Sequence, residues 1–153
     1  MKRSLFVGVC LLALFALAGG AWADEGGARK VIGTDKAPAA IGPYSQAIQV
    51  GEFLYVSGQI PVDPKTGEVV EGGVEAQARQ SLENVKAVLE AAGYGMQDVV
   101  KTTVFAADMG DFATVNGIYA QYFEKDPPAR SFVAVKALPR AVLVEIEVVA
   151  FKK

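Results

Sequence analysis

Two runs of apolar, β-branched residues near the C-terminus constrain the fold most strongly. Residues 127–135 read PPARSFVAV and residues 142–151 read VLVEIEVVAF, and both compositions favour β-strands. The break at residues 138–140 predicts that the two strands form a β-hairpin. Arg130 and Glu145 are then expected on neighbouring strands, within a pair or two of register. Because a guanidinium can hold a substrate carboxylate and a glutamate can activate a water, this pair is a candidate for a small hydrolytic site.

The preceding chain alternates between strand and helix patterns. Apolar residues recur every three or four positions from Val74 to Ala92, and Gly93 follows, which predicts one amphipathic helix. A second helix is expected from Asp108 or Asp111 to Pro127. The remaining strands are predicted at residues 30–33, 44–50, 53–60 and 99–106. The fold class is therefore α+β, a mixed β-sheet with two helices packed on one face.

The last predicted strand is apolar on both of its faces. Val142, Val144 and Ile146 alternate with Leu143, Val149 and Phe151 on the opposite side. Two helices cover only one side of the sheet, so we expect a second copy of the chain to cover the other side. Self-association as a closed ring follows as a hypothesis.

The first 23 residues are predicted to be a secretory signal peptide. A basic start at Lys2-Arg3 precedes an apolar stretch, and an Ala-x-Ala pattern ends at Ala23. The stretch is short for a membrane anchor, and Cys10 lacks the setting of a lipidated cysteine. We therefore expect cleavage after Ala23, a single mature domain of residues 24–153, no membrane association after removal of the signal, and a periplasmic or secreted location.

Composition narrows the chemistry of the mature chain. The full sequence has 15 basic and 17 acidic residues, and loss of Lys2 and Arg3 leaves 13 minus 17, a net charge of −4. Nucleic-acid binding by charge alone is not expected. The sequence has no histidine, and its one cysteine leaves with the signal peptide, so catalytic triads, thiolate nucleophiles and the usual zinc sites are excluded. No metal or cofactor is expected.

Six motifs, in order along nearly the whole mature domain, resemble the RidA family, also called the YjgF/YER057c/UK114 family. They are AAIGPYSQA at 39–47, VSGQIP at 56–61, QARQSLENV at 77–85, FATVN at 112–116, PARS at 128–131 and VEIE at 144–147. The resemblance implies a trimeric chorismate-mutase-like fold with a site in each cleft between subunits. It also implies hydrolysis of enamines and imines to 2-keto acids and ammonia without a cofactor.

The resemblance also assigns roles to individual residues. Arg130 would grip the substrate carboxylate, and Glu145 would orient or activate the attacking water. The other pocket positions match Tyr44, Ser57, Gly58 and Asn116, and Phe132 stands where family members commonly have cysteine. If that position acts through its backbone, phenylalanine is tolerable; if its side chain matters, the substrate range would change.

Simpler interpretations of the same residues stay open. Arg130 and Glu145 could form a structural ion pair at a subunit interface, and Ser57-Gly58 could be a strand-end turn. Glu147 is expected to support the structure, and Tyr119 to be an ordinary core aromatic. A non-enzymatic trimer that binds small carboxylates or shields unfolded proteins is the alternative function. The ribonuclease activity attributed to certain relatives is disfavoured by the negative charge and the lack of histidine.

Overall fold

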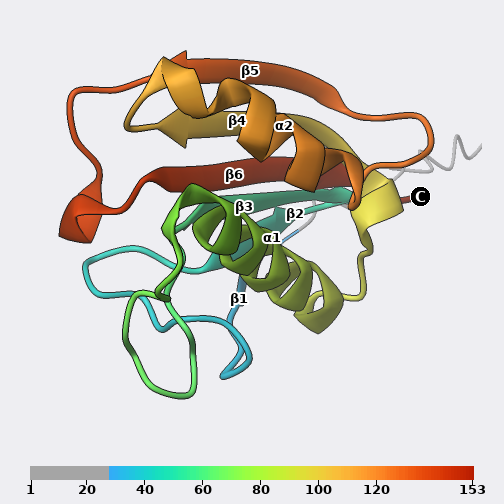
Figure 1. Ribbon diagram of the computed structural model, residues 1–153. Coiled ribbons are helices and arrows are strands. Elements are labelled where there is room, and N and C mark those ends of the chain that lie inside the picture. Colours follow the sequence, from blue (N-terminus) through green and yellow to red (C-terminus); the bar gives the residue numbers. More distant parts are fainter. Residues whose placement is uncertain (1–27) are drawn as a thin grey trace, which may run out of the picture.

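The structure is a computed structural model that describes residues 28–153. The predicted signal peptide, residues 1–23, lies outside this described part. The elements are β1 (Lys30–Ile32), β2 (Ala47–Val50), β3 (Phe53–Gln59), α1 (Gly73–Ala91), β4 (Val99–Ala106), α2 (Phe112–Ala120), β5 (Ala129–Ala134) and β6 (Val144–Phe151), as Figure 1 shows. Three short 3₁₀ turns cover Met96–Asp98, Met109–Asp111 and Pro139–Ala141. No helix in residues 28–153 has the length and apolar character to cross a membrane.

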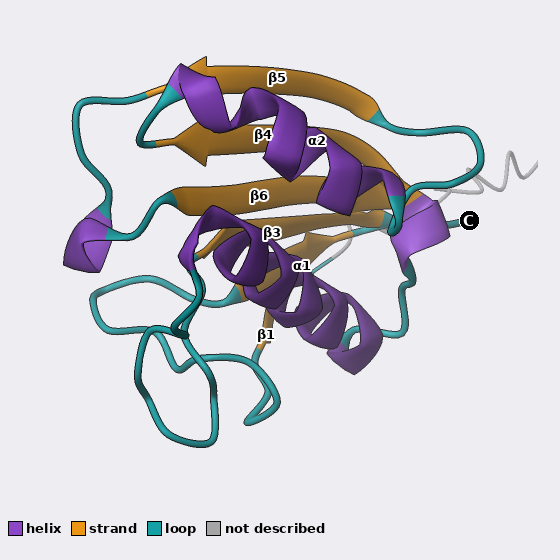
Figure 2. Ribbon diagram, in the orientation of Figure 1, coloured by secondary structure: helices purple, strands orange, loops and turns teal. Residues whose placement is uncertain are grey.

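The strands form one mixed sheet in the order β1-β2-β3-β6-β4-β5. All neighbouring strands are antiparallel except β4 and β5, which are parallel. Both helices pack on the same side of this sheet (Figure 2). The predicted α+β class and the placement of the two helices on one face are therefore confirmed.

The predicted C-terminal hairpin is wrong. β4 lies between β5 and β6, pairing with the first in parallel and with the second in antiparallel fashion. The nine residues 135–143 pass around the end of β4, where Val135 N–H donates to the Ala106 carbonyl and Ala107 N–H donates to the Leu143 carbonyl. Because β6 is apolar on both faces, it is suited to the centre of the sheet, while the largely exposed β5 lies at an edge.

The core lies between α1, α2 and the sheet. Along α1, the fully buried apolar residues Ala78, Leu82, Val85 and Leu89 confirm the predicted helix face. They pack over the sheet residues Val104, Val144 and Ile146, which have no exposed surface. The second helix ends at Ala120, earlier than the predicted Pro127, and the turns that follow keep Phe123 in the core.

The sheet face away from the helices, here called the open face, is partly apolar. Pairing places Val31, Ile48, Tyr55 and Val149 side by side across four strands. Val31 is 57% exposed and Tyr55 is 50% exposed. Nearby, Phe53 packs its ring against Phe151, with ring centres 5.0 Å apart. Exposed apolar patches of this kind are typical of interaction surfaces, and the self-association expected from the sequence stays a prediction.

Candidate functional site

The seven predicted site residues fall into two groups on opposite faces of the sheet. Arg130, Phe132 and Asn116 lie on the helix side. Tyr44, Ser57, Gly58 and Glu145 line one cavity at the open face. We call the first group, with the aromatic rings around it, the Arg130 cluster, and the second the Glu145 cavity.

Strand register determines the face on which each charged residue lies. Arg130 pairs with Thr102 of β4, which is buried under the helices. Glu145 pairs with Phe105, three residues further along β4 and on the other face. Three residues along a strand and two strand spacings each amount to about 10 Å, so the Cα atoms of Arg130 and Glu145 lie about 14 Å apart. The expectation that they are neighbours within one chain is therefore wrong.

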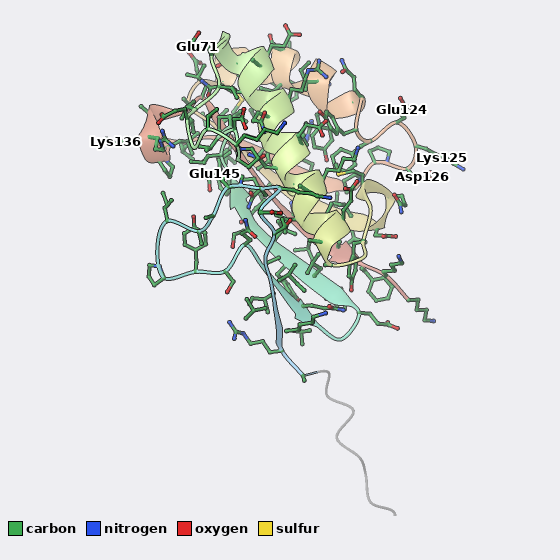
Figure 3. All side chains as sticks on the ribbon, turned by 90° about the horizontal axis from the view of Figure 1, so that it is seen from below. Glu71, Glu124, Lys125, Asp126, Lys136 and Glu145 are labelled. Atoms are coloured by element: carbon green, nitrogen blue, oxygen red, sulfur yellow. The ribbon has the colours of Figure 1, made fainter. Side chains whose placement is uncertain are left out.

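The two residues also lie toward opposite ends of the sheet. Arg130 is the second residue of β5, directly after the loop that carries Glu124, Lys125 and Asp126. Glu145 is the second residue of β6, after the segment that contains Lys136. Figure 3 shows that loop and Lys136 on opposite sides of the molecule, with Glu145 nearer to Lys136.

In the Arg130 cluster, helix α2 and strand β5 hold the guanidinium from several sides. Nη2 of Arg130 donates to Oδ1 of Asn116 at 2.9 Å. Cζ of Arg130 lies 4.5 Å from the ring centre of Tyr119, 5.7 Å from that of Phe112 and 5.9 Å from that of Phe132. The rings of Phe112 and Phe132 meet edge to face with centres 4.9 Å apart. Cation–π attraction to these rings restricts the guanidinium, while its N–H groups other than the one on Asn116 remain available to a carboxylate.

Tyr119 anchors this cluster to the sheet. Its hydroxyl shares a hydrogen bond of 2.9 Å with Oγ1 of Thr102, and both groups are buried. Burial raises the pKa of Tyr119, and the Thr102 hydrogen bond and the Arg130 charge oppose that rise. Tyr119 is thus a neutral ring fixed beneath Arg130, and it has a larger role than the ordinary core aromatic expected from the sequence.

The Glu145 cavity has a volume of about 280 Å³ and is lined by Ile41, Tyr44, Ser57, Gly58, Ile60, Pro139 and Glu145. Ser57 and Gly58 form a β-bulge, because β3 sets these two residues against the single residue Glu147 of β6. A Cβ atom on residue 58 would collide with the Glu145 carboxylate, so a larger residue there would displace that carboxylate. The Oγ atom of Ser57 donates to the Ser45 carbonyl at 2.7 Å and ties the bulge to the Tyr44 loop.

Glu145 lies in surroundings that favour its protonated form. Its partial burial raises the pKa of the carboxyl group, and the nearby charge of Glu147 raises it further. Glu147 was expected to support the structure, and the geometry adds this electrostatic effect on Glu145. A carboxylate with a raised pKa is a better proton acceptor near neutral pH than an ordinary glutamate. Among residues 28–153, no group of three or more histidine, cysteine, aspartate or glutamate side chains is arranged to hold a metal ion.

Several site residues were not singled out from the sequence. Phe112 and Tyr119 lie four residues before and three residues after Asn116, on the same side of α2. That spacing could have associated them with Asn116, and hence with Arg130. Ile41, Ile60 and Pro139 belong to the Glu145 cavity through tertiary folding, and the sequence carries no local signal for them.

Known proteins resemble nearly the whole of the described domain. The family described as Endoribonuclease L-PSP matches residues 34–152. A RutC family protein of Pyrococcus horikoshii is 57% identical over 125 residues, which cover 82% of this chain and 99% of that protein. The 2-iminobutanoate/2-iminopropanoate deaminase of Mus musculus is 57% identical over 122 residues, which cover 80% of this chain and 90% of that protein. The chain belongs to the RidA family.

A solved structure supports the fold directly. The crystal structure of E. coli TdcF with bound serine superimposes with a TM-score of 0.78 at 49% identity, covering 81% of this chain and 99% of that one. The family resemblance inferred from the six motifs is confirmed, and the matched region contains every predicted site residue. RidA relatives include proteins named imine deaminases and proteins with only a family name, so membership alone leaves the reaction open.

Proposed function

We propose that this protein hydrolyses 2-imino acids and their enamine tautomers to 2-keto acids and ammonia. The observation that carries the proposal is a pair of complementary half-sites: a fixed guanidinium for a carboxylate, and a half-buried carboxylate beside a cavity. The name of the mouse relative and the serine bound to TdcF agree with a small amino-acid-like ligand.

Substrate recognition would depend on the Arg130 cluster. Asn116 and three aromatic rings hold the guanidinium before any ligand arrives. The planar fork of donors matches a carboxylate in two parallel hydrogen bonds. Because the arginine is already ordered, less conformational freedom is lost when the substrate binds.

The chemical step would depend on Glu145. The carboxylate accepts a proton from water as the water oxygen bonds to the imine carbon, and it passes that proton to the imine nitrogen. In the resulting carbinolamine the hydroxyl proton moves to the amino nitrogen as the C–N bond breaks, so ammonia leaves and the keto acid remains. One water is consumed and no oxidant is required. An imine carbon is already electrophilic, so positioning and proton transfer can suffice.

A complete site would require two copies of the chain. Within one copy, Arg130 and Glu145 lie on opposite faces of the sheet, too far apart to act on one small imino acid. We propose a homotrimer in which the Arg130 cluster of one copy meets the Glu145 cavity of its neighbour. The exposed apolar residues of the open face supply a surface for such an assembly.

The test generates imino acids from amino acids with an amino-acid oxidase and follows their disappearance with the purified protein. Wild type is expected to accelerate hydrolysis, and Arg130→Ala to lose most kcat/KM while it stays assembled and folded. Arg79→Ala is the matched control, because Arg79 is an exposed arginine of α1 that bonds Gln121 outside the cluster. Equal activity of wild type and Arg130→Ala would contradict the proposal.

The alternative is a non-enzymatic trimer that binds small carboxylates. The same Arg130 cluster favours it, since carboxylate capture requires no Glu145. Carboxylate binding without any imine hydrolysis would support this alternative, and Glu145→Gln would then leave the affinity unchanged. The family description also names an endoribonuclease, and RNA cleavage that survives in Arg130→Ala would point away from the deaminase site.

Export is a separate proposal that depends on the sequence of residues 1–23 alone. N-terminal sequencing of the protein from its native cell should find a chain that begins at Asp24. A chain that retains residues 1–23 would contradict cleavage.

A further inference from the structure

A second cavity adjoins the Glu145 cavity and has a volume of about 260 Å³. The two cavities share the wall residues Ile41, Tyr44, Gly58 and Ile60. Building on the deaminase function proposed above, we propose that this adjoining cavity binds the side chain of the imino acid and selects extended apolar side chains. In that arrangement the imine carbon lies beside Glu145, whose carboxylate lies against Gly58, and its substituent crosses the wall that the two cavities share.

Many of the residues that line only the adjoining cavity are apolar. They include Pro38, Ala39, Val62 and Pro64. The volume corresponds to that of roughly nine liquid waters, enough for a leucine or phenylalanine side chain. Burial of such a side chain against these walls is favoured by the hydrophobic effect.

The amide nitrogens of the two glutamines in these walls already have partners inside the protein. The Gln46 amide nitrogen donates to the carbonyl oxygens of Thr34, Ala37 and Pro38, and its oxygen accepts from Thr34 N–H. The Gln59 amide nitrogen donates to the Ser57 carbonyl at 2.9 Å. A polar substituent in this cavity would lose water without gaining these amide nitrogens as partners, which disfavours its binding. The cavity therefore favours an apolar occupant.

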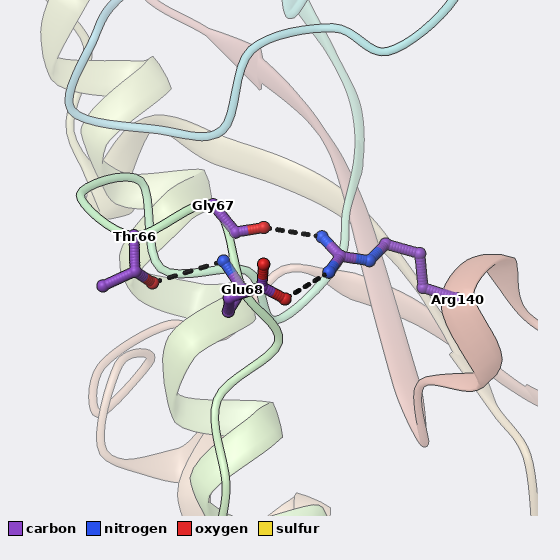
Figure 4. Close-up of polar contacts among 4 residues, drawn as sticks. All are labelled: Thr66, Gly67, Glu68 and Arg140. Atoms are coloured by element: carbon purple, nitrogen blue, oxygen red, sulfur yellow. Dashed lines mark hydrogen bonds and ion pairs between the residues drawn. The ribbon is translucent and has the colours of Figure 1, made fainter.

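Arg140 is the one charged residue in the wall, and its guanidinium already has two partners. Its Nη1 donates to the Gly67 carbonyl at 2.8 Å and its Nη2 pairs with Glu68 Oε2 at 2.9 Å (Figure 4). Arg140 has a φ of 56°, in the left-handed region that is uncommon for residues other than glycine. Because Glu68 already partners the guanidinium, the cavity offers no free cation to an acidic side chain.

The experiment compares kcat/KM for imines generated from alanine, leucine and phenylalanine. Wild type is expected to prefer the leucine-derived imine over the alanine-derived one by about tenfold or more in kcat/KM. One additional methylene in an apolar pocket changes kcat/KM by about ten- to 200-fold. Ala39→Phe places a ring at the exposed rim of the cavity and should lower kcat/KM for the leucine imine at least tenfold, with less than a twofold change for the alanine imine.

Two further variants control this test. Ala40→Phe adds the same ring at an exposed neighbour that is not part of the cavity wall, and it should change neither substrate. Val62→Ile adds one methylene inside the cavity with little risk to folding, and it should act selectively on the larger imines. If Ala39→Phe and Val62→Ile lower both imines equally, or neither, the inference is overturned while the deaminase function stands. Hydrolysis of the alanine imine alone by wild type would likewise overturn the inference and leave the deaminase function standing. If wild type hydrolyses no imine, the deaminase function and the side-chain selectivity are both overturned.

Discussion

Arg130 is held in place by contacts from its own chain. Asn116 accepts one of its N–H groups, and Tyr119 lies under its face. Glu145, by contrast, faces a cavity next to Gly58 and has no hydrogen-bonding partner to stabilise its charge among the contacts described. The proposed imine hydrolysis requires two groups: an ordered cation that binds the substrate carboxylate, and a carboxylate that accepts a proton from water.

The pH dependence of activity should report the surroundings of Glu145. Burial first, and Glu147 second, raise its pKa, so the acid limb of kcat/KM is expected above the ordinary glutamate value of about 4.3. Glu147→Gln removes the second carboxylate and should move that limb to lower pH. Glu124→Gln, on an exposed loop, should leave it in place. A limb that stays unmoved in Glu147→Gln would show that Glu145 is not the titrating base.

The raised pKa of Glu145 also changes how the stability of the fold depends on pH. A carboxyl group with a higher pKa in the folded state binds its proton more tightly there than in the unfolded chain, so its contribution to stability falls as pH rises through the folded pKa. At pH 7 the ionised Glu145 therefore destabilises the fold. Glu145→Gln is expected to lose about 10²- to 10⁴-fold in kcat, the usual contribution of a general base, with a thermal midpoint equal to or above that of wild type. A large drop in the midpoint would indicate a structural role instead.

Helix α2 contributes Phe112, Asn116 and Tyr119 to the site. Phe112 is 41% exposed, so its ring adds little to the core, yet it packs on Phe132 and lies near Arg130. Phe112→Leu keeps the apolar bulk and removes the ring. A surface cation–π contact is worth about 0.5–1 kcal/mol, so KM should rise about two- to fivefold while kcat changes little. Phe112→Tyr, which keeps the ring, should restore KM; a fall in kcat alone would argue against a role in carboxylate binding.

Strand β6 supports both the fold and the site, because it lies between β3 and β4. Ile146 has no exposed surface and packs under the helices, directly after Glu145. Ile146→Ala should lower the free energy of unfolding by about 2–5 kcal/mol in a denaturant titration. Val133→Ala, on the exposed edge strand β5, should change it by less than about 1 kcal/mol. Similar losses for the two variants would contradict a central position of β6.

The sequence predicts the elements better than their arrangement. The period of α1, from Ala78 to Leu89, depends on local spacing and is confirmed by burial. Strand order is a non-local property: an apolar β6 can pair with β5 or insert beside β4, and the pattern of residues 142–151 does not distinguish these outcomes. Motif resemblance identified Arg130 and Glu145, but the face on which each lies depends on register with β4, which no local signal specifies.

In the whole molecule, the separation of the two half-sites makes assembly part of the proposed catalysis. The open face carries exposed Val31, Val50, Phe53 and Tyr55, which a partner copy could cover. A folded but isolated chain would then bind carboxylates weakly and hydrolyse nothing. Activity should accordingly decline on dilution in step with the loss of trimer, as followed by light scattering.

Mixing two inactive variants tests the two-copy site most directly. Arg130→Ala and Glu145→Gln, each inactive alone, are coexpressed in equal amounts so that trimers contain both chains. About three quarters of such trimers are mixed, and each mixed trimer has one of its three sites with both residues intact, so about a quarter of wild-type activity should return. If the mixture stays as inactive as its components although mixed trimers are isolated, Arg130 and Glu145 do not act together across two copies.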